Sequence, residues 1–196
     1  MPGVADPTGA VHVYAYSNGS LAPSAVASLH VDTESEDGRQ ALAFNHASSL
    51  LAAAGLGGQV QLWDTAAWQP RQILAGAPAP AGLGLLNTDN VAFSPDGAYV
   101  FGGCYAIDGW DAATGAHHYA PENLVPNGCA GLAFAGNRRL LVADYEGGLT
   151  LWDLEREHSV LTWSAGEPPI SSIAVSPDGS TAAVGSGGLC AIYALM

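Results

Sequence analysis

The sequence predicts an all-β protein built from repeated four-stranded antiparallel units. Two observations carry this prediction. The run "VAFSPDGAYV" (91–100) returns in altered form as "IAVSPDGSTA" (173–182). Apolar and polar residues alternate along short runs that Gly, Pro, Asn and Asp separate, which is typical of strands rather than of helices.

Two sets of landmark residues give the same repeat length. Each unit has an alternating run, a turn and a second run rich in small and apolar residues. The aligned positions in the first run are Phe44, Phe93, Phe134 and Val175, spaced 49, 41 and 41 residues apart. A third run follows, with aligned aromatic residues Trp63, Trp110, Trp152 and Tyr193, spaced 47, 42 and 41 residues apart. This agreement predicts one structural unit per repeat.

A fourth run follows each Trp-Asp dipeptide, at residues 71–75, 116–120 and 159–163. The predicted units therefore cover about residues 39–75, 89–120, 129–163 and 170–196. Before them, we expect an N-terminal tail (1–10) and a strand pair (11–31).

The period and the Trp-Asp dipeptides resemble those of the WD40 repeat family. The dipeptides are Trp63-Asp64, Trp110-Asp111 and Trp152-Asp153, and the resemblance spans residues 11–196. It implies a β-propeller of about four four-stranded blades. The family's Gly-His dipeptide has no counterpart among the His positions. The resemblance is therefore to a degenerate propeller, and we expect apolar packing to replace most of the family's polar network.

About four blades are fewer than the seven or eight usual in this family, which leaves several architectures open. The run at 25–31 completes the last unit if one chain closes a four-blade ring. Two chains form an eight-blade ring if each gives this run to the other. The remaining alternatives are an open arc and a fragment of a larger propeller.

The repeated Ser-Pro-Asp-Gly turns, at 94–97 and 176–179, have a physical explanation. Pro95 presets φ near −65° at the first corner of a type I turn. Asp96 tolerates the next position, and Gly97 accepts the positive φ that returns the chain into an antiparallel strand. The turn recurs because the hairpin recurs.

Charge limits the expected partners. The chain has 18 acidic residues and 5 basic residues, all Arg, and a net charge of −13. Such a surface repels phosphate backbones, so we expect no nucleic-acid partner. We also expect no membrane partner, because no apolar run is long enough to span a bilayer. The three Cys residues, with no C-x-x-C pair and no signal peptide, favour an intracellular protein, cytoplasmic or nuclear.

The motifs predict binding rather than catalysis. We identify no catalytic, cofactor-binding or metal-binding residues, and Ser186 in "GSGG" (185–188) fits a turn better than a nucleophile elbow. We expect a non-catalytic scaffold that binds other proteins, through residues Asn87, Asp89, Tyr105, Tyr145 and Glu146. The alternative is a metal-dependent hydrolase or lyase that uses channel-facing carboxylates at Asp89, Asp108 and Asp144.

Overall fold

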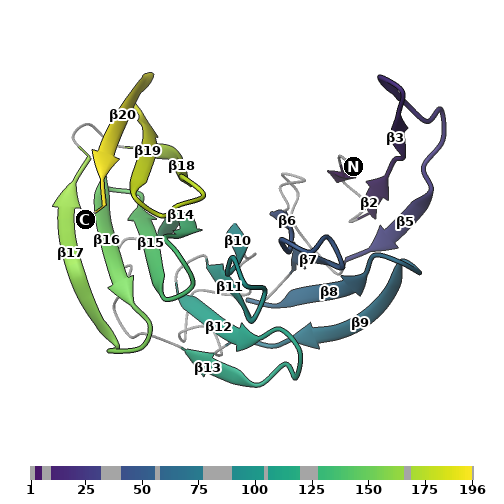
Figure 1. Cartoon of the computed structure of the whole chain (residues 1–196), viewed down its shortest axis with the longest axis horizontal. Coiled ribbons are helices and arrows are strands. Elements are labelled where there is room, and N and C mark those ends of the chain that lie inside the picture. Colours follow the sequence, from purple (N-terminus) through teal and green to yellow (C-terminus); the bar gives the residue numbers. More distant parts are fainter. Residues whose placement is uncertain are drawn as a thin grey trace, which may run out of the picture.

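The computed structural model describes residues 3–5, 10–31, 41–55, 58–76, 90–103, 106–119, 128–165 and 169–195. In this part of the chain every regular element is a β-strand and every strand pair is antiparallel. The all-β prediction is confirmed. The sheets follow one another around an open arc, with the N-terminal and C-terminal sheets at its two tips (Figure 1).

Three sheets have four strands each, ordered as in the chain. The first contains β6 (Leu42–Phe44), β7 (Leu50–Ala54), β8 (Val60–Asp64) and β9 (Gln69–Leu74). The second contains β10 (Asn90–Phe93), β11 (Tyr99–Gly103), β12 (Ile107–Asp111) and β13 (His117–Tyr119). The third contains β14 (Cys129–Phe134), β15 (Arg139–Asp144), β16 (Gly148–Asp153) and β17 (His158–Ser164).

A three-stranded sheet stands at each tip of the arc. The N-terminal sheet contains β1 (Gly3–Ala5), β2 (Ala10–Val13) and β5 (Ala27–His30). The C-terminal sheet contains β18 (Ile170–Val175), β19 (Thr181–Ser186) and β20 (Leu189–Ala194). A small hairpin of β3 (Tyr16–Ser17) and β4 (Ser20–Leu21) links β2 to β5.

The N-terminal region corrects two sequence-based expectations. Residues 3–5, assigned above to a tail, form β1 and pair with β2. The run at 25–31 does not complete the last unit, because β5 pairs with β2 from Ala10↔His30 to Val13↔Ala27. The two strands are close in sequence, so their pairing closes a much shorter loop than pairing with β20 would. The described residues thus form three complete sheets and two incomplete ones rather than four blades.

Successive sheets share one pairing register, which confirms the sequence alignment. The last residue of the first strand pairs with the second strand, and that partner pairs with the aromatic residue of the third strand. The aligned triplets are Phe44–Leu51–Trp63, Phe93–Val100–Trp110, Phe134–Leu140–Trp152 and Val175–Ala182–Tyr193. In the three complete sheets the pairing of the third and fourth strands shifts beside the Trp.

The sheets pack face to face, and a separate apolar cluster fills each of the four junctions. Val11 and Val13 meet Trp63, Leu62 and Val60 meet Trp110, Phe101 meets Phe134, and Leu149 and Leu151 meet Val184. The period-2 alternation places these residues on facing sides of neighbouring sheets. Along the inner side, β6, β10, β14 and β18 contact one another in turn. The first strand of each sheet therefore lines the concave side of the arc.

The Ser-Pro-Asp-Gly turns have the predicted conformation. The amide N–H of Gly97 donates to the carbonyl of Ser94 at 2.8 Å, and Gly179 makes the same bond to Ser176. Their φ angles are +72° and +73°. Each Ser hydroxyl donates to the Asp carboxylate of its own turn. Each turn is therefore closed by its own side chains as well as by its backbone.

Gly179 is expected to tolerate alanine less well than Gly97. Both positions require a positive φ, which costs a residue with a Cβ about 1–2 kcal/mol. A Cβ on Gly179 would also lie 2.9 Å from the backbone N of Gly136, whereas a Cβ on Gly97 would lie 3.7 Å from the Asn45 Nδ2 atom. Urea unfolding of Gly179→Ala and Gly97→Ala tests this. Equal losses of stability would show that the turns of neighbouring sheets do not touch as described.

The Asp of each Trp-Asp dipeptide closes the turn before the fourth strand. Asp64 Oδ1 accepts the amide N–H groups of Ala66 and Ala67, at 2.9 and 3.0 Å. Asp111 accepts in the same way from the residues two and three positions ahead, and so does Asp153. All three dipeptides therefore serve the structure of the repeat.

Candidate interaction surface

The most extended hollow in the described part of the chain crosses several sheets. It is an open groove of about 550 Å³. Its lining is Phe44, His46, Ala92, Phe93, Ser94, Pro95, Leu132, Ala133, Phe134, Gly136, Val175, Ser176 and Pro177. These residues come from β6, β10, β14 and β18 and from the turns that follow them. Four successive sheets thus contribute one equivalent position each.

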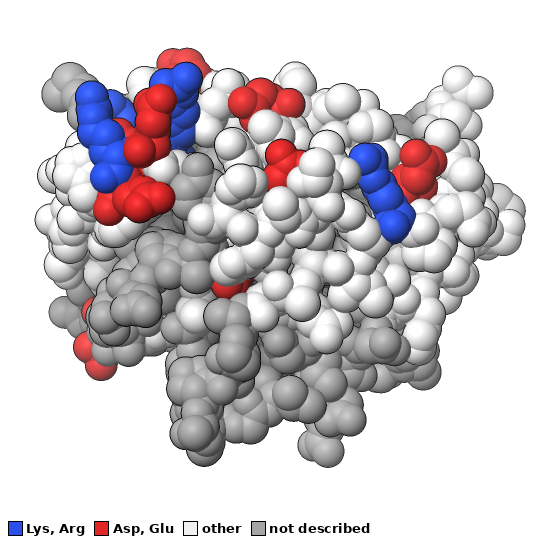
Figure 2. Space-filling view, turned by 90° about the horizontal axis from the view of Figure 1, so that it is seen from below, with Lys and Arg blue, Asp and Glu red and all other residues white. Residues whose placement is uncertain are grey.

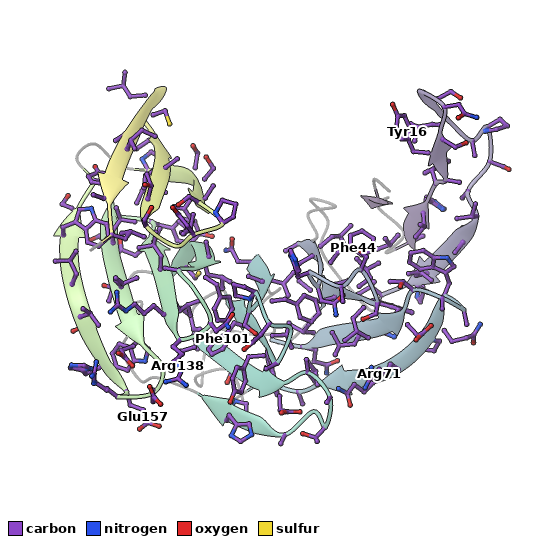
Figure 3. All side chains as sticks on the ribbon, viewed as in Figure 1. Tyr16, Phe44, Arg71, Phe101, Arg138 and Glu157 are labelled. Carbon is purple, nitrogen blue, oxygen red and sulfur yellow. The ribbon has the colours of Figure 1, made fainter. Side chains whose placement is uncertain are left out.

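Aromatic and proline side chains make this groove apolar. Phe44 is 38% exposed, whereas its counterpart Phe134 is 9% exposed. Figure 3 shows Phe44 on the inner side of the arc, away from the packed junction that holds Phe101. Exposed aromatic surface in a groove is typical of binding sites, because it gains free energy when a partner covers it. The arrangement can bind a chain but brings no reactive group into the groove.

Carboxylates stand at the rim, next to the two prolines of the lining. Asp96 follows Pro95, and Asp178 follows Pro177. The Ser176 hydroxyl and the Ser180 amide and hydroxyl donate to Asp178 and lower the pKa of its carboxyl group to about 2. Asp178 is therefore negatively charged throughout the neutral and mildly acidic range.

The low pKa of Asp178 predicts a pH dependence of stability. An Asp in an unfolded chain has a pKa of about 3.9. Because folding lowers this pKa, the carboxylate stabilises the fold fully above about pH 4, and this contribution is lost as the pH falls toward 2. The pKa values of Asp111 and Asp153 are lowered too, chiefly by the amide N–H groups of Thr114 and Arg156 respectively. We expect thermal midpoints measured from pH 5 to pH 2 to fall less steeply for Asp178→Asn than for the wild type, and parallel curves would contradict this.

Charged side chains also gather at the neighbouring turns of the third sheet. Arg138 pairs with Glu155 at 2.6 Å, and Arg156 pairs with Asp153 at 3.3 Å. Figure 2 shows Arg side chains set among carboxylates at one side of the molecule, while much of the remaining described surface in this view is uncharged. These two Arg residues are therefore already neutralised by carboxylates of their own sheet.

The residues predicted from sequence to bind proteins do not line the groove. Asn87, Asp89 and Tyr105 lie outside the described residues. Tyr145 and Glu146 occupy the turn between β15 and β16, at the opposite end of the sheet from the turn at the groove. Tyr145 is 40% exposed. Their role in protein binding stays a prediction, on a different face from the groove.

The carboxylates considered for catalysis have structural contacts. Asp108, on β12, is buried and lies 2.7 Å from the Nε2 atom of His117 on β13. Asp144 accepts the amide N–H groups of Glu146 and Gly148 and so closes its turn. The third candidate, Asp89, lies outside the described residues. Neither of the two described carboxylates lies on a first strand, where the concave side is formed.

Sequence reasoning missed two features of this surface. Phe44 and Phe93 were used as landmarks of the repeat, although an aromatic residue two positions before a turn proline also signals an apolar rim (Phe93-Ser94-Pro95). The contact of His117 with Asp108 and with Trp110, whose ring centres lie 5.8 Å apart, was not expected either. It depends on the pairing of β12 with β13, which local sequence does not reveal.

Wider comparisons leave the family open. No protein-family model matches the chain, and comparison with curated proteins gives no match. Among the described residues, no three His, Cys, Asp or Glu side chains are grouped so that they could hold a metal ion. The same part of the chain has no helix suited to crossing a membrane.

Proposed function

We propose that the chain is a WD40-like propeller arc that acts as a non-catalytic protein-interaction module. Its groove binds an extended segment of a partner protein, in which apolar side chains are flanked by Lys or Arg. The observation that carries this proposal is the apolar groove to which four successive sheets each contribute an equivalent position. A binding surface built by repetition is how solenoids and propellers recognise partners.

The WD40-like part of the proposal is supported by the repeat itself. Four sheets share the register of first, second and third strands. Three Trp-Asp dipeptides end the third strand and close the same turn. The first strands lie on the inner side of the arc, as they do in propeller blades (Figure 1).

The apolar part of the partner follows from Phe44 and the two prolines. A side chain that covers exposed apolar surface gains roughly 25 cal/mol per Å². The groove is open along the arc and not enclosed on all sides, so an extended segment fits it better than a compact small molecule. Each first strand is one step of the groove, so successive side chains of the segment meet successive sheets.

The basic part of the partner follows from charge. The whole chain carries −13, and Asp96 and Asp178 stand directly beside the groove prolines. The nearby Arg138 and Arg156 are each paired with a carboxylate. Opposite charge on the partner speeds encounter and selects the binding register.

A display experiment tests the proposed function. A phage-displayed library of random linear peptides is selected on the immobilised full chain, and the enriched peptides are synthesised and titrated by calorimetry. We expect enriched peptides to combine apolar residues with Lys or Arg. Phe44→Asp should weaken their binding at least about 30-fold, the loss typical of a central contact residue.

The matched control is Ile73→Asp, because Ile73 is exposed (56%) on β9, away from the groove lining. Its affinity should equal that of the wild type. Equal binding by Phe44→Asp and the wild type would overturn the groove as the site. If Tyr145→Ala abolished binding instead, the partner would bind the opposite face, as first expected from sequence.

A further inference from the structure

We propose that two copies of this chain associate head to tail, the C-terminal sheet of one copy packing on the N-terminal sheet of the other. The outer face of β18–β20 receives the outward face of β2 and β5. This surface is distinct from the groove, and the inference does not depend on what the groove binds. It rests on residues of the last sheet whose counterparts in the other sheets are buried.

Ile192 is the clearest of these residues. It pairs with Ala183 in the way that Leu62 pairs with Ala52 and Leu151 with Leu141. The next sheet of the chain covers Leu62 and Leu151 completely, whereas Ile192 is 66% exposed. The last sheet thus carries a core residue at a core position, with nothing in the described part of the chain to cover it.

The neighbouring position follows the same pattern. Cys190 pairs with Gly185, as Val60 pairs with Ala54 and Leu149 with Ala143. Val60 and Leu149 are fully buried, and Cys190 is exposed. Two successive positions of β20 therefore present apolar side chains on the face that, in each preceding sheet, packs on another sheet. The occupant that this face fits is a sheet of the same repeat.

The N-terminal sheet offers a free face of the complementary kind. Val11, Val13 and Leu29 point into the junction with the next sheet. The alternate residues His12, Ser28 and His30 point the other way, and Ser28 and His30 are exposed. His12 occupies the place held by Gln61 and Thr150 in other sheets, since Val13 aligns with Leu62. Polar residues at this place are thus compatible with sheet-on-sheet packing elsewhere in the chain.

Geometry and charge both favour a second copy as the occupant. The two end sheets stand at the separate tips of the arc, so one chain does not bring them together (Figure 1). A two-fold axis along that line of view places each N-terminal tip beside the C-terminal tip of the other copy. The residues named on the two end faces include no Asp, Glu or Arg. The contact therefore does not bring carboxylates together, despite the net charge of −13.

Light scattering and analytical ultracentrifugation of the full chain test the assembly. We expect a mass of twice the chain, with a dissociation constant that Ile192→Asp raises at least about 30-fold. The matched control is again Ile73→Asp, an equally drastic change at a position that is also exposed but lies away from both end faces. A wild type that stays monomeric at high concentration, or a dimer that Ile192→Asp leaves intact, would overturn the proposal.

A second variant separates head-to-tail packing from a symmetric contact between two C-terminal sheets. Ser28→Asp, at the other end of the chain, should weaken the dimer as well and should speed maleimide labelling of Cys190, read by peptide mass. Ser159→Asp, on the exposed strand β17, serves as control and should change neither. If Ile192→Asp broke the dimer but Ser28→Asp changed neither its mass nor the labelling of Cys190, the head-to-tail arrangement would be wrong.

Discussion

Replacing Trp110 by alanine is expected to lower the free energy of unfolding by about 3–5 kcal/mol. The indole is 1% exposed in the junction between the first and second sheets, and its Nε1–H donates to the carbonyl of Ala75 at 3.1 Å. Alanine leaves a cavity that the close-packed sheets cannot fill, and it leaves that carbonyl without its donor. Urea unfolding followed by circular dichroism measures the loss.

Trp152 is the control at the same position of the repeat. It pairs with Leu140 as Trp110 pairs with Val100, but it is half-buried. Trp152→Ala should therefore lose clearly less stability than Trp110→Ala. If the two variants lost equal stability, burial in the junction would not be what makes the aromatic residue important.

The second large effect concerns a pair of residues with exchanged sizes. In the first and third sheets the cross-strand pair is Ala52–Leu62 and Leu141–Leu151, whereas in the second sheet it is Phe101–Gly109. A Cβ on Gly109 would lie 2.4 Å from the ring of Phe101, which is fully buried against Phe134. Gly109→Leu should therefore be destabilised by at least about 1–3 kcal/mol through overpacking, and Phe101→Ala by about 3–5 kcal/mol through a cavity.

Combining the two substitutions should recover stability, because the double variant restores the Ala–Leu pair of the first sheet. We expect the double variant to be more stable than the sum of the single losses implies, with a coupling energy of about 0.5–3 kcal/mol. Urea unfolding of the four proteins in the cycle gives this number. Strict additivity would mean that the two positions do not share one site, and the structural equivalence of the sheets would then fail there.

Local features of the chain explain why the strands could be predicted. Alternation and turn residues act over a few positions, so the strands from Leu42 onward and the turns at Gly97 and Gly179 follow directly from the sequence. The aromatic landmarks also reveal the register, because each repeat carries them at the same distance from its turn. These are the parts of the fold that depend on near neighbours.

The parts that could not be predicted depend on contacts between distant segments. Strand β5 has the composition of a fourth strand whichever sheet it joins, and its pairing with β2 follows from chain connectivity. The groove joins residues about forty positions apart, and Phe44 becomes a surface residue only through the way the sheets are stacked. Sequence reasoning placed the binding residues on loops because exposed Tyr and acidic residues are visible in the sequence, whereas a concave side is not.

The shared register of successive sheets underlies every conclusion above, and nuclear magnetic resonance measures it directly. In a labelled sample, backbone NOEs should pair Leu51 with Trp63, Val100 with Trp110, and Leu140 with Trp152. All three pairs observed together are the predicted result. A shift by one residue in any of them would turn its apolar side chains to the opposite face and would contradict the repeated packing.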